Sequence, residues 1–267
     1  GQIDAGPHEE DLVAREHERY PSYNSTQVRA PQAYWDRWHR ECDLADAIIV
    51  NSEWSKRALE EAGVAGDHVR VVPLAYSYPS SPPSRSVPSA FTKQRPLRVL
   101  YLGTLTLRKG LARMVEAAHR VAHLPIEIRV VGGGSLQLPA EAQEATNIEW
   151  VGRVPRSETV KHYRSADVFL FPTLSDGFGL TQLEAQSVGL PVIASKRCGD
   201  VVEPFVNGIQ LSSLCPETIA EALYWCVRHP AEVKQMIANS PYRMGRFAPT
   251  SVVDRLQKVT RQVASAS

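Results

Sequence analysis

The sequence predicts an α/β protein, built on a parallel sheet with helices on both of its faces. Short apolar runs alternate with amphipathic stretches along most of the 267 residues, the pattern of repeated strand–helix–strand units. This alternation is regular from about residue 95 onward and much reduced before residue 77. A segment rich in serine and proline, residues 77–96, separates the two parts.

Six apolar runs in the second part are expected to form one parallel sheet. Strands buried on both faces are nearly continuous in apolar residues, and these runs match that description. They are residues 98–102, 126–131, 148–151, 168–171, 191–194 and a weaker run at 209–211. Helical patterns cover about 110–122, 156–165, 178–188 and 216–228. Right-handed crossovers would bring all the strands' carboxyl ends to one edge, where α/β sheets bind ligands.

The first 76 residues contain only one such unit. Residues 47–50 and 69–72 are expected strands, and Ser52 should cap the helix over 53–62. A polar segment with Tyr34, Trp35 and Trp38 precedes them. One unit is less than a domain, and the chain starts with neither a methionine nor an apolar leader, so we interpret it as part of a longer chain. The expected divisions are a remnant of a first domain (1–76), an exposed linker (77–96), a second domain (97–248) and a closing helix (249–267).

The composition argues against several classes of function. Thirty Lys and Arg residues balance 29 Asp and Glu, so no global charge recruits nucleic acid or an anionic membrane. No stretch approaches the roughly 20 apolar residues that cross a bilayer, which leaves only peripheral membrane contact open. The four cysteines form no CxxC pair, which favours reduced thiols and a cytoplasmic location.

Residues 173–191, TLSDGFGLTQLEAQSVGLP, are the most informative segment of the chain. Gly177-Phe178-Gly179-Leu180 should begin a helix, where free backbone N–H groups and the helix dipole attract anions. Asp176 lies in the loop before it and Glu184 lies within the helix. A phosphate site between two carboxylates that can bind hydroxyl groups suits a sugar nucleotide.

Both acids also have a structural interpretation. A carboxylate before a helix, such as Asp176, is often an N-cap or a partner of the helix dipole. Glu184 lies in a segment with almost no other charge, so it needs either a protein partner or a ligand. We favour the functional interpretation for both residues.

Residues 101–110, YLGTLTLRKG, place Arg108 and Lys109 at the entry to the first helix of the second part. The two cations could neutralise a diphosphate and stabilise it as a leaving group, with Lys109 the better candidate. A solvated helix start is the alternative, although basic residues are disfavoured in a first turn.

Other motifs carry less information. The triple glycine 132–134 lacks the frame of a dinucleotide site and is expected to form a tight turn. No metal site is expected, because His119, His123 and His162 lack a set of partner ligands.

When its motifs are taken together, the chain resembles the retaining, two-domain (GT-B) glycosyltransferases of family 4. ADAIIVNSEWSKRALEEAG and VRVVPLA are similar to the end of that family's N-terminal domain. Its C-terminal, donor-binding domain is matched in order by RVLYLGTLTLRKG, IEIRVVGGGS, NIEWVGRV, HYRSADVFLFPTLSDGFGLTQLEAQSVGLPVIA and the closing helix. The resemblance covers nearly the whole chain and implies a Rossmann-like second domain, the C-terminal half of a GT-B fold, after a partial first domain.

The resemblance also implies roles for single residues. The family's acid-x7-acid pair fits Asp176, which would hold hydroxyls of the donor sugar, and Glu184, which would hold the ribose. Lys109 matches its diphosphate-binding lysine, and Arg108 is expected to assist. The implied donor-binding set comprises Gly103, Thr104, Val154 near the base, Gly177, Phe178, Gly179, Leu180 and Thr181.

Two positions depart from the family pattern. Asp176 stands where glutamate is usual and is about one methylene shorter, and Thr104 stands where an arginine is usual. Arg108 is the expected substitute for that missing charge. The PNG element of the family also reads Pro73-Leu74-Ala75 here.

The resemblance implies an enzyme of class EC 2.4 that moves a sugar from a UDP-, GDP- or ADP-sugar to a carbohydrate or other acceptor. It implies retention of anomeric configuration, without a metal or cofactor. The fragment by itself is expected only to bind the donor. A non-catalytic sugar-nucleotide-binding module or partner subunit is the alternative, motivated by Thr104, Asp176 and the missing acceptor half. An NAD-type dehydrogenase is disfavoured, because the glycine pattern is wrong and the paired acids stay unexplained.

Overall fold

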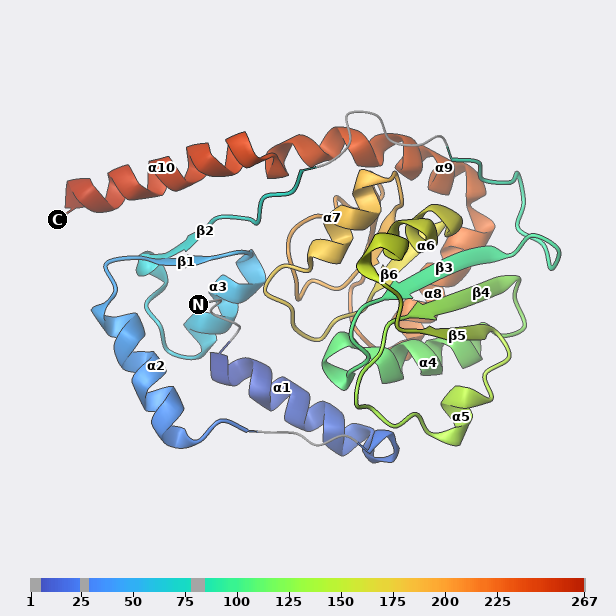
Figure 1. Cartoon of the computed structure of the whole chain (residues 1–267), viewed down its shortest axis with the longest axis horizontal. Coiled ribbons are helices and arrows are strands. Elements are labelled where there is room, and N and C mark those ends of the chain that lie inside the picture. The colour runs from blue at the N-terminus through green and yellow to red at the C-terminus, as the bar shows by residue number, and fades with distance from the viewer. Residues whose placement is uncertain (1–5, 25–28, 78–84, 267) are drawn as a thin grey trace.

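The computed structural model describes residues 6–24, 29–77 and 85–266 (Figure 1). Its second part forms one six-stranded parallel sheet with the strand order β5-β4-β3-β6-β7-β8. The strands are β3 (Leu97–Leu102), β4 (Ile126–Val131), β5 (Ile148–Gly152), β6 (Val168–Phe171), β7 (Val192–Ala194) and β8 (Gly208–Gln210). All six predicted strands are confirmed, and no strand end differs by more than one residue.

The central strand of the sheet is β3, from which the chain builds outward in both directions. Leu97 pairs with Ile126 of β4 on one side, and Val99 pairs with Val168 of β6 on the other. The strand order therefore reverses between β3 and β6. The loops that follow these two strands diverge to opposite faces and leave room for a ligand at the carboxyl edge of the sheet.

Helices cover both faces, as predicted (Figure 1). One face carries α4 (Leu111–Arg120) and α8 (Pro216–Arg228), and the other carries α6 (Thr159–Ser165) and α7 (Leu180–Ser187). The alternation along β3 shows the cause. Val99 and Tyr101 lie in the core under α4 and α8, whereas Leu100 lies in the core under α6 and α7. A sheet buried on both faces explains why its strands read as continuous apolar runs.

In the first part of the chain, the predicted βαβ unit is present. It consists of β1 (Ile48–Val50), α3 (Glu53–Glu61) and β2 (Val69–Val71), with the two strands paired in parallel. The hydroxyl of Ser52 accepts a hydrogen bond from the backbone N–H of Ser55 at 3.1 Å, which confirms the N-cap.

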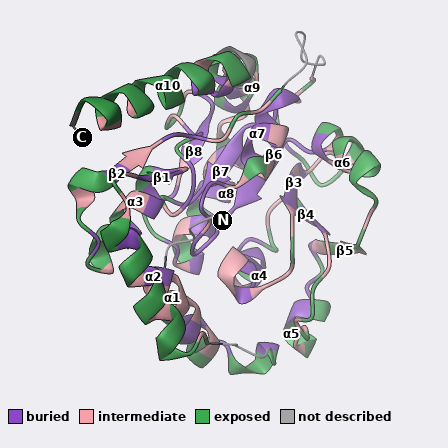
Figure 2. Cartoon of the chain, turned by 60° about the vertical axis from the view of Figure 1, so that its left-hand side comes forward, coloured by how far each residue is buried: buried purple, intermediate pink, exposed green. Residues whose placement is uncertain are grey.

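Two helices precede this unit and were not predicted: α1 (Gly6–Arg19) and α2 (Gln32–Leu44). The second contains the aromatic cluster of the polar segment, yet of its residues only Trp38 and Cys42 are buried. A helix that lies mostly in solvent has little apolar periodicity, so its sequence carries a weak signal. Figure 2 shows this difference between the largely exposed α2 and the buried strands of the sheet.

The remaining helices are α5 (Ala140–Gln143), α9 (Pro230–Asn239) and α10 (Pro249–Ala266). The closing helix was predicted over 250–264, whereas α5 and α9 were not predicted. Figure 1 shows α10 running from the second part of the chain back across the first. Within the described ranges, no helix combines the length and the apolar character needed to cross a bilayer.

The expected linker, residues 77–96, lies partly outside the described residues, which omit 78–84. From Arg85 onward some of its residues anchor the segment to the second part of the chain, while others, such as Lys93, are exposed as expected. The guanidinium of Arg85 donates hydrogen bonds to the carbonyls of Val188 at 3.2 Å and Tyr163 at 3.1 Å, and Phe91 is buried. Arg85 therefore holds the described start of this segment against α6 and the end of α7.

One buried carboxylate ties the amino edge of the sheet together. Asp167, immediately before β6, accepts hydrogen bonds from the guanidinium of Arg95 at 2.7 Å and from that of Arg98 at 3.0 Å. It also accepts one from the backbone N–H of Arg98 at 2.9 Å. Burial by itself would raise the pKa of the Asp167 carboxyl, but the hydrogen bonds from the two arginines prevail and hold it below its ordinary value.

We predict that Asp167→Asn lowers the free energy of unfolding at neutral pH by about 1.5–3 kcal/mol, the usual contribution of hydrogen bonds to a charged group. Because the pKa is depressed in the folded state, this stabilisation is complete above the ordinary value of 3.8. It is lost as the pH falls from there through the lower pKa of the folded protein. Denaturant unfolding between about pH 7 and pH 3 should show the two proteins converging only below about pH 4.

Asp254→Asn, at an exposed position of α10, is the matched control and should change the free energy of unfolding by less than about 0.5 kcal/mol. A difference between wild type and Asp167→Asn that stays constant down to about pH 3 would contradict the assigned role.

Candidate functional site

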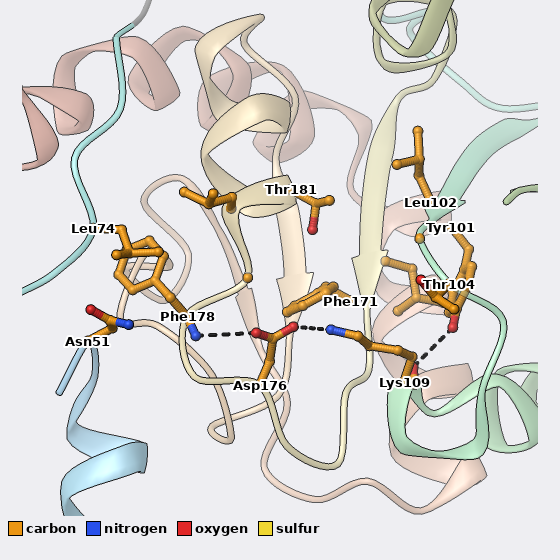
Figure 3. A pocket seen from close by; sticks show the side chains of 14 residues that line it. Asn51, Leu74, Tyr101, Leu102, Thr104, Lys109, Phe171, Asp176, Phe178 and Thr181 are labelled. Carbon is orange, nitrogen blue, oxygen red and sulfur yellow. Dashed lines mark hydrogen bonds and ion pairs between the residues drawn. The ribbon is translucent and has the colours of Figure 1, made fainter. Parts of the chain in front are cut away.

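A cavity of about 610 Å³ opens at the carboxyl edge of the sheet, where the strand order reverses between β3 and β6. One wall comes from the segment after β3, another from the loop after β6 and the start of α7, and a third from the first part of the chain (Figure 3). Its place agrees with the general rule that open α/β sheets bind ligands at such a reversal.

Most of the residues predicted from the sequence line this cavity. They are Gly103, Thr104, Lys109, Asp176, Phe178, Gly179, Leu180 and Thr181. Arg108, Val154, Gly177 and Glu184 are not among its lining residues. The structure thus brings together residues from two loops that lie about 70 positions apart in the sequence.

Lys109 and Asp176 form a direct ion pair within the cavity (Figure 3). Lys109 ends a 3₁₀ turn (Leu107–Lys109), and its Nζ also lies 5.5 Å from the centre of the Phe171 ring. Asp176 accepts a second hydrogen bond from the backbone N–H of Phe178 at 3.2 Å. Both charged side chains are therefore held in place, and each partly neutralises the other.

The start of α7 faces the same cavity. Gly179 is the N-cap residue, with φ of +79°, and no side chain caps the helix. The first backbone N–H groups of a helix have no partner within it, so this end can bind an anion. The hydroxyl of Thr181, in the first turn, is buried and has no hydrogen-bond partner in the described part of the chain. The cavity is lined by Gly179, Leu180 and Thr181, so the backbone N–H groups at this end of α7 lie beside the space that a ligand would occupy.

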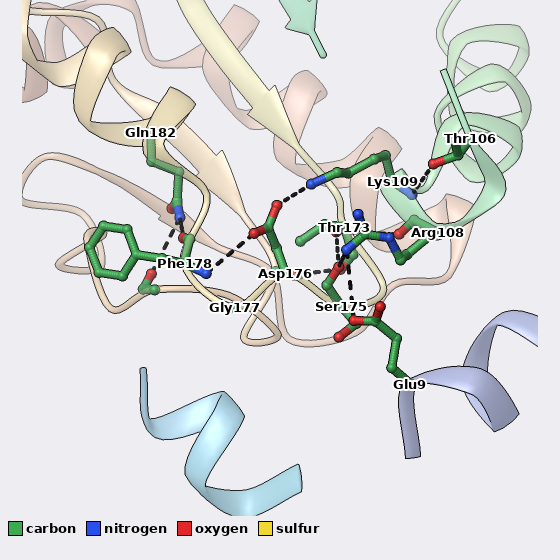
Figure 4. Close-up of polar contacts among 12 residues, drawn as sticks. Glu9, Thr106, Arg108, Lys109, Thr173, Ser175, Asp176, Gly177, Phe178 and Gln182 are labelled. Carbon is green, nitrogen blue, oxygen red and sulfur yellow. Dashed lines mark hydrogen bonds and ion pairs between the residues drawn. The ribbon is translucent and has the colours of Figure 1, made fainter. Parts of the chain in front are cut away.

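Arg108 has a different position from the one expected. Its guanidinium donates a hydrogen bond to the carbonyl of Ser175 at 3.0 Å and forms an ion pair with Glu9 of α1 at 3.7 Å (Figure 4). The hydroxyl of Thr173 donates to the same carbonyl at 3.0 Å. In this arrangement Arg108 supports the loop that carries Asp176, and Lys109 is the cation that reaches the cavity.

Glu184 lies outside the cavity lining and has two protein partners. The phenol of Tyr163 donates a hydrogen bond to one carboxylate oxygen at 2.9 Å, and Arg156 lies 3.5 Å from the other. Burial, reinforced by the negative charge of Glu184, raises the pKa of Tyr163, so the phenol stays neutral and remains a donor. The sequence analysis expected Glu184 to have either a protein partner or a ligand. Tyr163 and Arg156 are protein partners, as the structural interpretation of Glu184 predicts.

Sequence reasoning missed Asn51 and Leu74, which line the cavity from the first part of the chain. Asn51 directly follows β1, so its position just after a predicted strand, where α/β sheets bind ligands, could have found it. Leu74 follows β2 in the same way, a few residues further on. Among the residues that the structure describes, no group of three or more His, Cys, Asp and Glu side chains could hold a metal ion.

Residues 96–229 match the family model described as "Glycosyl transferases group 1". The chain is 31% identical over 144 residues to the amylovoran biosynthesis glycosyltransferase AmsK of Erwinia amylovora, covering 48% of this chain and 34% of AmsK. It is 26% identical over 181 residues to D-inositol 3-phosphate glycosyltransferase 1 of Catenulispora acidiphila, covering 61% and 43% of the two chains. The chain thus spans less than half the length of these relatives.

Solved structures share the fold. The lipopolysaccharide outer core galactosyltransferase WaaB has a TM-score of 0.64 at 21% identity, over 81% of this chain and 62% of WaaB. HepE of Anabaena, in complex with UDP and glucose, has a TM-score of 0.63 at 20% identity, over 86% and 67%. The sucrose-phosphate synthase of Thermosynechococcus elongatus has 0.64 at 22%, over 96% and 67%. These similarities confirm the predicted fold class, a Rossmann-like parallel sheet flanked by helices as in GT-B proteins.

We predict that Gly179→Ala lowers the free energy of unfolding more than Gly152→Ala does. The two glycines have nearly the same φ, +79° and +80°, so each alanine incurs the left-handed backbone cost of about 1–2 kcal/mol. A Cβ at Gly179 would lie 2.6 Å from the Phe171 ring, whereas one at Gly152 would meet no atom within 4 Å. The clash should add about 1–3 kcal/mol for Gly179→Ala.

Urea unfolding of both variants measures the difference. Equal losses would show that α7 does not depend on this close approach to Phe171.

Proposed function

The chain belongs to the family of group 1 glycosyl transferases, and we propose that it carries the donor-binding part of an enzyme that transfers a sugar from a nucleoside-diphosphate sugar to an acceptor. One observation carries the proposal. The cavity at the strand reversal combines a lysine, a carboxylate and an open helix N-terminus within one space of about 610 Å³. The lysine and the helix N-terminus can bind a diphosphate, and the carboxylate can accept hydrogen bonds from the hydroxyls of a sugar.

In this proposal the diphosphate lies between Lys109 and the first turn of α7. Its negative charge would compete with Asp176 for the lysine, and the N–H groups of Leu180 and Thr181 would meet its oxygens. Asp176 would then accept hydrogen bonds from hydroxyls of the sugar. When the bond between the anomeric carbon and the diphosphate oxygen breaks, the electron pair stays on that oxygen, and these groups stabilise the added charge. The acceptor's hydroxyl oxygen bonds to the anomeric carbon, and its proton passes to the departing diphosphate oxygen.

The nucleoside would extend past α7 toward Glu184 and Val154. A ribose there would take the place of Arg156, which is 88% exposed and 3.5 Å from the Glu184 carboxylate, while Tyr163 keeps the other oxygen. We further propose, from the resemblance to family 4, that transfer retains the anomeric configuration and needs no metal. Uridine nucleotides are the first to test, because HepE, a protein with this fold, is described in complex with UDP and glucose.

The acceptor is proposed to be a carbohydrate or another hydroxyl compound, bound mainly outside the described cavity.

All four cysteines are free, which agrees with a cytoplasmic location for the protein.

The first test is a thermal-shift screen with UDP, GDP and ADP. A nucleoside diphosphate at about 100 times its Kd should add roughly 2.7 kcal/mol of stability. Lys109→Met should weaken binding of that nucleotide about ten- to hundredfold, because each hydrogen bond to a charged group contributes about 1.5–3 kcal/mol. Lys93→Met, at an exposed lysine outside the cavity, should bind as the wild type does. Stabilisation by none of the three nucleotides would reject the proposal.

A second test separates the two acids by calorimetry. Asp176→Asn should weaken binding of the sugar nucleotide about tenfold, since it loses hydrogen bonds from the sugar to a charged group. It should leave the affinity for the bare nucleoside diphosphate equal or higher, because Lys109 is released from its ion pair. Glu184→Gln should weaken both ligands alike, about ten- to hundredfold, because the ribose is common to them. Equal losses for the two ligands in both variants would contradict this division of roles.

A further inference from the structure

Asn51 lies at the end of the cavity opposite Lys109. In Figure 3 Asn51 and Leu74 stand on one side and Lys109 and Thr104 on the other, with Asp176 between them. Asn51 is half-buried, and its side-chain amide makes no hydrogen bond to the described part of the chain. An amide oriented toward a cavity without a protein partner is available to a ligand.

The backbone on both sides of Asn51 is fixed. Val50, immediately before it, is buried in the small sheet, and its carbonyl accepts a hydrogen bond from the N–H of Val72 at 2.9 Å. Ser52, immediately after it, is fully buried and caps α3 through its hydroxyl. The carboxamide therefore projects from a rigid backbone segment, which is the requirement for a residue that selects a ligand.

This backbone segment is itself attached to the loop that carries Asp176. The indole N–H of Trp54 donates a hydrogen bond to the hydroxyl of Ser175 at 3.0 Å, and the hydroxyl of Ser55 lies 3.4 Å from the carbonyl of Gly177. Ser175 and Gly177 are the two neighbours of Asp176 in the sequence. The first part of the chain thus holds Asn51 at a set position relative to the carboxylate of Asp176.

The charges in the cavity determine what lies near Asn51. Lys109 and Asp176 are the charged side chains in its lining, and Figure 3 shows that Lys109, the cation, lies on the far side of Asp176 from Asn51. A phosphate prefers the lysine and the start of α7, so the group beside Asn51 should be neutral and polar. A carboxamide both donates and accepts hydrogen bonds, as a hydroxyl does, whereas Asp176 can only accept.

We propose that Asn51 is a specificity-determining residue that binds a hydroxyl of the sugar transferred from the donor. The inference rests on the proposed function and adds to it a contact from the other part of the chain. Asp176 and Asn51 would approach the sugar from two sides, so the position and orientation of its hydroxyls would determine which sugar is bound.

The test compares Asn51→Ala with wild type in calorimetric titrations. The ligands are the nucleoside diphosphate that stabilises the wild type and its sugar forms, such as UDP with UDP-glucose and UDP-galactose. Asn51→Ala should weaken binding of a preferred sugar nucleotide about three- to tenfold, the worth of one neutral hydrogen bond, and reduce discrimination between the two epimers. Its affinity for the bare diphosphate should stay within about twofold of the wild type.

Gln257→Ala, which removes an exposed amide from α10, is the matched control and should leave all affinities unchanged. Folding of Asn51→Ala should be intact in a thermal melt, because the Asn51 side chain makes no hydrogen bond to the residues that the structure describes. If the wild type binds the sugar nucleotide and Asn51→Ala binds it equally well, the inference is wrong while the proposed function stands. Equal weakening of diphosphate and sugar nucleotide, or slower transfer with unchanged donor affinity, would also overturn it, by assigning Asn51 to the nucleotide or the acceptor. A wild type that binds no nucleotide would overturn the proposed function and this inference with it.

Discussion

The reversal of strand order between β3 and β6 is the constraint on which the rest of the structure depends. All six strands run parallel, so their carboxyl ends and the loops that follow share one edge. Because the chain builds outward from β3 in both directions, the loops after β3 and β6 leave the sheet toward opposite faces. The cavity forms between them, and Lys109 and Asp176 meet across it. Neither loop could provide the site without the other.

The site is completed by a second set of contacts, between the two parts of the chain. Glu16 of α1 is buried and paired with the guanidinium of Arg113 on α4, with a hydrogen bond of 2.6 Å. Removing one partner of such a buried pair leaves an uncompensated charge, which makes the contact a firm attachment. Trp54 makes a comparable attachment near the cavity, because the guanidinium of Arg197 lies 5.5 Å from its ring while its N–H binds Ser175. These contacts let a short N-terminal unit contribute to a cavity that belongs mainly to the second part.

The charged groups of the site are paired with protein partners before any ligand contacts them. Lys109 is held by Asp176, and Glu184 is held by Tyr163 and Arg156. Such pairing lowers the cost of keeping partly buried charges in a folded protein. It also fixes their orientation, so a ligand exchanges one partner for another and does not have to order a mobile side chain. Arg108 contributes to the same preorganisation by supporting the loop at Ser175.

The sequence by itself determined the strands and the main helices around the sheet, and only the tertiary structure decided how they combine. Apolar runs such as 168–171, the cap at Ser52 and the glycines before α7 act through near neighbours, so their effect can be read locally. The mostly exposed helix α2 lacked such a signal, because only two of its side chains are buried. Partners far apart in the sequence have no local signature. The family resemblance implied that Lys109 and Asp176 share a site, but only the folded chain shows their ion pair. Only the folded chain also shows that Arg108 binds Ser175 and that Asn51 lines the cavity. The reason is that strand pairing and packing, which bring such residues together, depend on the order in which the strands are arranged.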